Sequence, residues 1–275
     1  MILKAFPGLL CGICLFGCTV NRPLGPAARL ELITSRPLIA AHRAMHLNHS
    51  ENSLAAIAES VQTKIPLIEV DLRLSTDGAL YLFHNQKVDS EKVQGPKELI
   101  GRDFHSLSST EVNKIILPKG EQVPEFSSVV GAVNSSSSAF ILDLKTPLES
   151  NKLILEEISK NGLDGAYWFL CYTPECITDV KASKLPVSFI ARVGAKLPLQ
   201  EALNSSPTII QIDCKILCKE EVTKIKKKLP RSFVLVNSLS ELDYPAHWEF
   251  LKSSGVDIIL TDQPSLLNQA LLETF

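Results

Sequence analysis

Eight short apolar segments, separated by stretches with helical patterning, recur along this chain and constrain its fold more than any other feature. They span Leu38–His42, Leu67–Leu72, Ala139–Asp143, Ala166–Cys171, Val187–Arg192, Thr208–Asp213, Phe233–Asn237 and Val256–Thr261. Apolar strands without polar alternation are typical of parallel sheets that helices cover on both faces. Eight such units predict an α/β fold, a closed (β/α)8 TIM barrel over residues 31–275.

One unit departs from this pattern between Leu72 and Ala139. Asp77-Gly78 precedes a second extended run, Ala79–His84, and an aspartate–glycine pair between two strand-like runs is a strong hairpin signal. A long polar stretch follows. The pattern therefore predicts a small insertion after the second strand, at about residues 85–125.

Helical patterns fill several of the connections between the apolar segments. They cover Ser53–Val61, Leu148–Ser159, Pro174–Ala182, Glu220–Lys228 and Pro264–Leu272. We expect Asn52 to cap the first of these helices and Asp262 to cap the last, because both side chains can accept hydrogen bonds from free backbone N–H groups. No linker-like stretch divides the body of the chain, so we expect one domain.

The first 30 residues have the pattern of an export signal. Lys4 is followed by an apolar run that is short for a bilayer span and resembles the core of a secretory signal peptide. Leu15-Phe16-Gly17-Cys18 resembles the lipobox of bacterial lipoproteins. Residues 1–17 are therefore predicted to be the signal peptide, Cys18 the lipidated residue and residues 18–30 a tether. An uncleaved anchor helix or an ordinary signal peptide is the alternative.

The predicted lipid anchor implies a location in the cell envelope. The residue two positions after Cys18 is Val20 rather than aspartate, which under the sorting rule of enteric bacteria implies delivery to the outer membrane. We therefore expect a membrane partner through the lipid anchor, with the protein on the periplasmic face.

Charge argues against a nucleic-acid partner. The formal net charge is −2, so no overall field attracts a polyanion. The one basic cluster, Lys224 to Lys228, falls at the end of a predicted helix, where cations are favoured by the helix dipole. No nucleic-acid role is expected.

The body of the chain holds four of the seven cysteines: Cys171, Cys176, Cys214 and Cys218. An even number suits an oxidising compartment, and the close spacing within each pair allows local disulfides. Their spacing does not match the usual zinc motifs. We rank buried free thiols first and local disulfides second.

Acidic side chains end two of the predicted strands. Glu69 and Asp71 are two residues apart, so both point to one face of their strand, and Asp143 ends the next barrel strand. Buried carboxylates repel one another, whereas Mg²⁺ and Ca²⁺ prefer oxygen ligands. Glu69, Asp71 and Asp143 are therefore the predicted metal ligands. Ion pairs with Arg43, Arg73 or Lys145 are the alternative.

Two histidines and two cations accompany these carboxylates. His42 and His84 each follow an apolar run, Arg43 follows His42, and Lys145 lies two residues after Asp143. Histidine suits proton transfer near neutral pH, and arginine and lysine suit phosphate oxygens. Together these groups are the parts needed for metal-assisted cleavage of a phosphodiester.

The order and residue sequence of these motifs resemble those of the glycerophosphodiester phosphodiesterase family. The resemblance rests on Ala41-His42-Arg43, Glu51-Asn52-Ser53, Glu69-Val70-Asp71, Phe83-His84 and Asp143-Leu144-Lys145. It implies a phosphodiesterase barrel with His42 and His84 as catalytic acid and base, with Glu69, Asp71 and Asp143 holding Mg²⁺ or Ca²⁺, and with Arg43 and Lys145 binding the substrate phosphate.

Four positions depart from the family pattern. Ala44 replaces a glycine, Ser50 a proline, Asn85 an aspartate and Asp143 a glutamate. Ala44 is unstrained only at negative φ. Asp143 is one methylene shorter than glutamate, so the bound metal must shift or a water must bridge.

The implied activity is metal-dependent hydrolysis of a glycerophosphodiester to an alcohol and glycerol 3-phosphate. Two alternatives stay open. One is a related barrel phospholipase that acts on intact lipid, and the other is a lipoprotein that binds phosphate esters without turnover.

Overall fold

The structure is a computed structural model of the chain. It describes residues 37–134, 136–145, 150–162, 167–183, 185, 188–213 and 218–273. The predicted signal peptide, the predicted lipidation site Cys18 and the tether at residues 18–30 lie outside the described residues. None of the helices in these ranges has the length and apolarity needed to span a bilayer.

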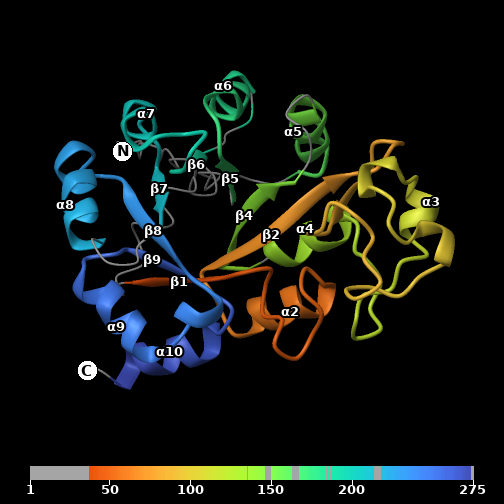
Figure 1. Cartoon of the computed structure of the whole chain (residues 1–275), viewed down its shortest axis with the longest axis horizontal. Helices are drawn as coiled ribbons and strands as arrows, with labels where there is room; N and C mark the ends of the chain where they lie inside the picture. Colours follow the sequence, from red (N-terminus) through yellow and green to blue (C-terminus); the bar gives the residue numbers. More distant parts are fainter. Residues whose placement is uncertain are drawn as a thin grey trace, which may run out of the picture.

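Eight parallel strands form a closed barrel. They are β1 (Leu38–Ala41), β2 (Leu67–Leu74), β4 (Ala139–Leu144), β5 (Tyr167–Cys171), β6 (Ser188–Arg192), β7 (Ile209–Ile212), β8 (Phe233–Ser238) and β9 (Ile258–Thr261). Each pairs in parallel with the next along the chain, and β1 pairs with both β9 and β2, which closes the ring. The predicted TIM barrel is confirmed, and the predicted strand ends agree to within two residues (Figure 1).

Alternate side chains of the strands fill the barrel interior. One buried cluster takes every second residue of the strands, for example Leu38 and Ala40 from β1 and Ile258 and Leu260 from β9. Positions of the same parity at the carboxyl ends of the strands therefore point into the barrel mouth, where barrel enzymes carry their active sites.

Helices cover the outside of the barrel (Figure 1). They are α2 (Leu54–Gln62), α4 (Phe126–Asn134), α5 (Asn151–Lys160), α6 (Pro174–Ala182), α7 (Leu199–Asn204), α8 (Cys218–Lys228), α9 (Pro245–Ser253) and α10 (Pro264–Glu273). The five predicted helices are present. The predicted cap of α2 is wrong by one residue: the Ser53 hydroxyl, not Asn52, accepts from the Ala56 N–H at 3.1 Å.

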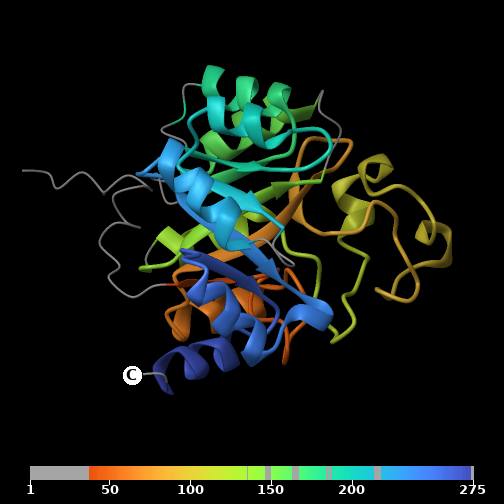
Figure 2. The same cartoon turned by 60° about the vertical axis from the view of Figure 1, so that its left-hand side comes forward.

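The segment between β2 and α4 is an insertion with a small core of its own. β3 (Leu80–Leu82) pairs antiparallel with β2 through the predicted turn, in which Gly78 has φ +87°. Three short helices follow: the 3-10 helices η1 (Lys97–Leu99) and η2 (Phe104–Ser106), and α3 (Ser109–Val112). Apolar side chains pack inside the insertion, including Phe83 and Phe104, whose rings stack 4.9 Å apart. Figures 1 and 2 both show it at one side of the barrel.

The cysteines correct one expectation. Cys171, the last residue of β5, forms a disulfide with Cys176 in the first turn of α6, and Cys218 is also disulfide-bonded. Free thiols were ranked first, but Cys171 and Cys176 form a local disulfide and Cys218 is disulfide-bonded. Adjacent strand and helix ends bring cysteines five residues apart to a Cα–Cα distance of 5.5 Å, which suits a disulfide.

Candidate active site

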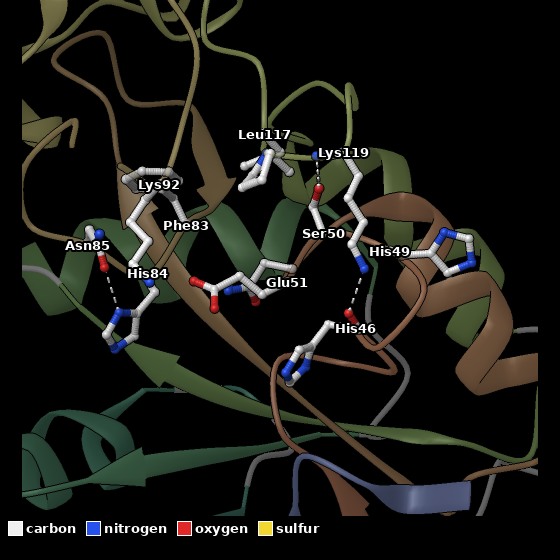
Figure 3. A pocket seen from close by; sticks show the side chains of 12 residues that line it. His46, His49, Ser50, Glu51, Phe83, His84, Asn85, Lys92, Leu117 and Lys119 are labelled. Atoms are coloured by element: carbon white, nitrogen blue, oxygen red, sulfur yellow. Dashed lines mark hydrogen bonds between the residues drawn. The ribbon is translucent and has the colours of Figure 1, made fainter. Parts of the chain in front are cut away.

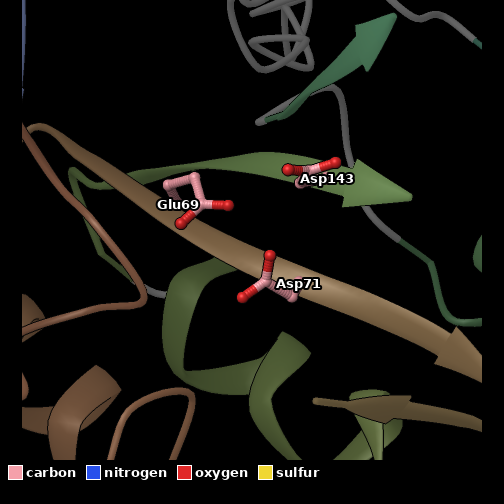
Figure 4. Close-up of side chains that lie close together, drawn as sticks. All are labelled: Glu69, Asp71 and Asp143. Atoms are coloured by element: carbon pink, nitrogen blue, oxygen red, sulfur yellow. The ribbon is translucent and has the colours of Figure 1, made fainter. Parts of the chain in front are cut away.

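Three buried carboxylates meet at the carboxyl ends of two neighbouring strands. Glu69 and Asp71 share the inward face of β2, and the register of the sheet pairs Asp71 with Asp143 of β4. Their exposed fractions are 2%, 1% and 3%. One oxygen of each lies within 4.8 Å of the others (Figure 4). The structure thus brings the three predicted metal ligands together.

Cations contact the same carboxylates. Arg43 donates its backbone N–H to Glu69 at 2.8 Å, and its Nε lies 3.4 Å from Asp71. Lys145 Nζ lies 2.7 Å from Asp143 and 3.4 Å from Asp71. The ion pairs considered as the alternative to metal binding are therefore present for Arg43 and Lys145.

Arg43 and Lys145 do not fully offset the negative charge of the three buried carboxylates. Burial raises the pKa of Glu69 well above its usual value, and the charges of Asp71 and Asp143 add to the rise. Burial also raises the pKa of Asp143. Asp143 Oδ1 is buried without a hydrogen-bond partner among the described residues. An oxygen-only set with an unpartnered buried oxygen fits a hard divalent cation held by Glu69, Asp71 and Asp143.

Arg73 holds the two neighbouring segments in place. Its guanidinium donates to the backbone carbonyl of His84, at 2.6 Å from Nη2, and also to the carbonyl of Lys145. Arg73 forms no ion pair with the three carboxylates in the described part of the chain, although the charges of Asp71 and Asp143 act on its pKa, which burial lowers. It fixes the backbone at both His84 and Lys145.

The turn after β1 is strained and positions Arg43. Arg43 and Ala44 have φ of 51° and 63°, so alanine occupies the conformation in which we expected strain. The turn directs the Arg43 N–H to Glu69, and the guanidinium pairs with Glu51 at 2.7 Å. Asn52, also at positive φ, accepts from the Asp71 N–H and donates to Asp71 Oδ2 at 2.8 Å. Asn52 thus fixes a predicted metal ligand.

His42 lies at the end of β1 with one ring nitrogen engaged. Its Nδ1 is 2.7 Å from Asp262 Oδ1. Asp262 is held in turn by Asp243, which accepts from the Asp262 N–H at 2.8 Å. Burial raises the pKa of Asp262, but the hydrogen bond from His42 acts together with the charges of His42 and His46 and a backbone hydrogen bond, and the pKa is lowered overall. The pairing leaves Nε2 of His42 free of Asp262.

The role expected for Asp262 was wrong. Its side chain contacts His42, whereas Thr261 Oγ1 accepts from the N–H of Gln263, the residue before α10. The sequence carried a usable signal, because Asp262 has the same parity as the inward-facing Ile258 and Leu260 of β9. The register places β9 directly beside β1.

His84 follows β3 on the insertion. Its Nδ1 lies 2.9 Å from Asn85 Oδ1, so the amide takes the place that a carboxylate has in the family motif. Burial lowers the pKa of His84, which favours the neutral ring. Asp71, Arg43 and Lys145 are close enough to act on that pKa. The insertion thus brings the second histidine to the carboxylates.

A cavity of about 190 Å³ adjoins His84. It lies between the loop after β1 and the insertion, and Figure 3 shows Glu51, Lys92 and Lys119 around it. Phe83 and Leu117 supply apolar wall. Lys119 Nζ donates to the carbonyl of Leu47 at 2.6 Å, which ties the insertion to the loop.

Tyr172 is a contact that the sequence did not indicate. It directly follows β5, and its hydroxyl donates to Asp143 Oδ2 at 2.8 Å. Strand parity again carried the signal, since Trp168 and Leu170 of β5 face the barrel interior.

Comparisons with known proteins agree with the site. Residues 42–173 match the model of the Glycerophosphoryl diester phosphodiesterase family. A Glycerophosphodiester phosphodiesterase of Caldanaerobacter subterraneus subsp. tengcongensis is 24% identical over 246 residues, which cover 84% of this chain and 96% of that protein.

Solved structures share the fold. An Oleispira antarctica phosphodiesterase in complex with the product sn-glycerol-3-phosphate has a TM-score of 0.72 at 19% identity, covering 86% of this chain and 97% of that chain. A glycerophosphoryl diester phosphodiesterase from Parabacteroides distasonis has a TM-score of 0.71 at 17% identity, covering 90% and 91%. Residues 42–173, which hold both histidines and all three carboxylates, are therefore similar to the glycerophosphoryl diester phosphodiesterase family and lie within the (β/α)8 barrel.

Proposed function

We propose that this protein is a metal-dependent glycerophosphodiester phosphodiesterase that releases an alcohol and glycerol 3-phosphate. The observation that carries the proposal is the convergence of two histidines, two cations and three buried carboxylates at one barrel mouth. The matching family model and the names of the relatives support the same activity.

The carboxylates Glu69, Asp71 and Asp143 would hold the cation. When bound, a divalent cation neutralises charge on the phosphoryl oxygens and lowers the pKa of a coordinated hydroxyl or water. Arg43 and Lys145 would bind the remaining phosphate oxygens and stabilise their charge as the phosphorus is attacked. Both already lie beside Asp71, so a phosphate on the cation comes within their reach.

His42 and His84 would divide the proton transfers. One takes the proton of the attacking hydroxyl as its oxygen bonds to phosphorus. The other gives a proton to the alcohol oxygen as the phosphorus–oxygen bond breaks. The attacking group is a water, or a neighbouring substrate hydroxyl that first gives a cyclic phosphate. Asp262 and Asn85 each engage Nδ1 of one ring, so each Nε2 is the nitrogen available to substrate.

The cavity beside His84 would hold one arm of the diester. Its volume of about 190 Å³ suits a small group, since a cavity of 150 Å³ holds a molecule of benzene size. A small alcohol fits this space.

Exposed apolar side chains favour a second candidate, a phospholipase that acts on intact lipid. Leu47, Tyr172 and Tyr244 follow β1, β5 and β8 respectively and are 59%, 39% and 46% exposed. Such side chains around the barrel mouth could contact a bilayer. Glycerophosphodiesters remain the proposal because the matching family model and the curated relative carry that activity in their names.

The test is a cation titration of product release. Purified protein receives Mg²⁺ or Ca²⁺ with a panel of glycerophosphodiesters and, in parallel, vesicles of the intact parent lipids, with EDTA as control. The proposal expects glycerol 3-phosphate from the deacylated substrates only, and none in EDTA. Release of diacylglycerol from vesicles would favour the phospholipase, and binding without turnover would favour a phosphate-ester-binding protein.

The location of the protein belongs to the proposal as well. We propose a lipid-anchored protein on the periplasmic face of the cell envelope, with the outer membrane as its site. The disulfides of Cys171, Cys176 and Cys218 support an oxidising compartment. Cys18→Ser should leave the precursor unprocessed and abolish metabolic labelling with palmitate. Normal labelling of this variant would overturn the lipid anchor.

A further inference from the structure

Asp143 is held by one of its two oxygens. Oδ2 accepts from the Tyr172 hydroxyl at 2.8 Å and lies 2.7 Å from Lys145 Nζ. Oδ1 is buried and has no hydrogen-bond partner among the described residues. Two donors thus fix the orientation of the carboxylate and leave the other oxygen for a cation.

During the proposed reaction, Tyr172 is the donor that stays on Asp143 throughout. Lys145 would bind a phosphate oxygen, which weakens its hold on the carboxylate. Tyr172 has no such second task. Aspartate is a short ligand, so the direction in which its free oxygen points decides whether it reaches a cation shared with Glu69 and Asp71. Tyr172 sets that direction.

The chain around Tyr172 is covalently restrained. Cys171 precedes it and is bonded to Cys176, so Tyr172 lies inside a closed loop between β5 and α6. The Thr173 hydroxyl oxygen also accepts a hydrogen bond from the Cys176 N–H at 3.2 Å. Tyr172 is 39% exposed, and a partly exposed side chain loses conformational freedom when it is held in one place. The disulfide reduces that cost because the backbone is already fixed.

We propose that Tyr172 is a positioning residue for the metal ligand Asp143, and that the Cys171–Cys176 disulfide holds Tyr172 in place. The inference rests on the metal site of the proposed function. It predicts that cation affinity depends on a phenolic hydroxyl and a disulfide, neither of which touches the cation.

Tyr172→Phe removes the hydroxyl and keeps the ring. The affinity for Mg²⁺ and Ca²⁺, measured by calorimetry, should fall about tenfold, as is usual when a group behind a metal ligand is removed. At saturating cation kcat should stay near the wild-type value, while the cation concentration for half-maximal activity rises. Tyr244→Phe is the matched control, because Tyr244 is also an exposed tyrosine after a barrel strand.

Cys176→Ser tests the disulfide. It should weaken cation binding about threefold to tenfold in the wild-type background and have no further effect together with Tyr172→Phe. Cys218→Ser is the control for loss of a disulfide elsewhere and should leave cation affinity unchanged. Thermal unfolding midpoints of all variants identify any that fold poorly, and Tyr172→Phe, which keeps both disulfides, carries the test on its own.

Three results would overturn the inference. They are wild-type cation affinity in Tyr172→Phe, an equal further loss when Cys176→Ser is added to that variant, and the absence of cation binding by the wild-type protein. Calorimetry needs no turnover. A wild-type protein whose cation affinity depends on Tyr172 but which hydrolyses no diester would contradict the proposed function and leave this inference standing.

Discussion

A few hydrogen bonds decide which atoms of the site remain free to react. His42 gives one ring nitrogen to Asp262, Asp143 gives one oxygen to Tyr172, and Asp71 is held by Asn52. The second ring nitrogen of His42 and the second oxygen of Asp143 are left for substrate or cation, whereas the second oxygen of Asp71 lies 3.4 Å from Lys145. Orientation at this site is therefore maintained by residues that need not touch the reacting atoms.

Asp262→Asn should lower kcat by about one to three decades, because the amide cannot hold the His42 ring in the same tautomer. Cation affinity should not change, since Asp262 does not contact the three carboxylates. Steady-state kinetics and calorimetry on the same preparation check both parts. A variant with wild-type kcat would show that His42 needs no orientation by Asp262.

Residue types were easier to predict from the sequence than their partners. Motifs and strand parity identified the two histidines, the three carboxylates and the two cations, because each lies at or near the end of an apolar run. Asp262, Asn52 and Tyr172 were missed or given other roles. Their contacts span up to 220 residues, and only the closed barrel brings those segments together.

At the scale of elements, the insertion and the loop after β1 act as one unit. Glu121 accepts from the Ser50 N–H at 2.9 Å and from the Ser53 hydroxyl at 3.0 Å. Burial raises the pKa of Glu121, but these hydrogen bonds outweigh it and the pKa is lowered overall. The contacts fix the insertion that carries His84 against the turn that carries Arg43.

Glu121→Gln should loosen this connection. The amide N–H₂ group would replace one carboxylate oxygen and would face the Ser50 N–H or the Ser53 hydroxyl, which are themselves donors. We therefore expect a loss of about 1–3 kcal/mol in the free energy of unfolding. KM should rise severalfold because the cavity lies at this junction. Denaturant unfolding and kinetics measure the two effects. Glu98→Gln, exposed on the same insertion, should change neither, and equal effects in the two variants would contradict the account.

The barrel strands were predictable because the continuous apolar sequence of each one indicates that it is buried on both faces. The insertion was not predictable in detail. Its short helices and small core follow from packing among residues such as Phe83, Phe104 and Leu117, and its polar sequence gives little periodicity. The short helix α7 was also missed, since six residues are too few to show an amphipathic pattern.

For the whole molecule, the buried carboxylates couple stability to pH and to cations. The raised pKa of Glu69 means that the folded state holds a proton that the unfolded state has released, in the range from its usual pKa of 4.5 up to the raised value. The free energy of unfolding of the cation-free protein therefore falls as pH rises through that range.

Glu69→Gln isolates this contribution, because glutamine does not titrate. Between pH 5 and pH 7.5 the cation-free wild-type protein should lose stability relative to the variant, because only the wild-type protein carries the titrating Glu69 carboxyl. Saturating Mg²⁺ or Ca²⁺ should restore the free energy of unfolding of the wild-type protein at pH 7.5, and it should not raise that of the variant. A stability difference that stays constant with pH would mean that Glu69 is charged in the folded protein.

The central claim is that His42 and His84 transfer the protons of phosphodiester hydrolysis. The most direct measurement is kcat of His42→Ala, His84→Ala and the double variant on a glycerophosphodiester and on a nitrophenyl phosphodiester. Each single variant should lose about two to four decades on the natural diester. The double variant should lose less than the sum of the two losses, because both groups act in one step.

The nitrophenyl substrate assigns the roles. Its good leaving group needs little acid catalysis, so it should rescue the variant that lacks the acid and leave the other impaired. Near-wild-type kcat for His84→Ala on the glycerophosphodiester would contradict the two-histidine mechanism and remove the insertion from the chemistry.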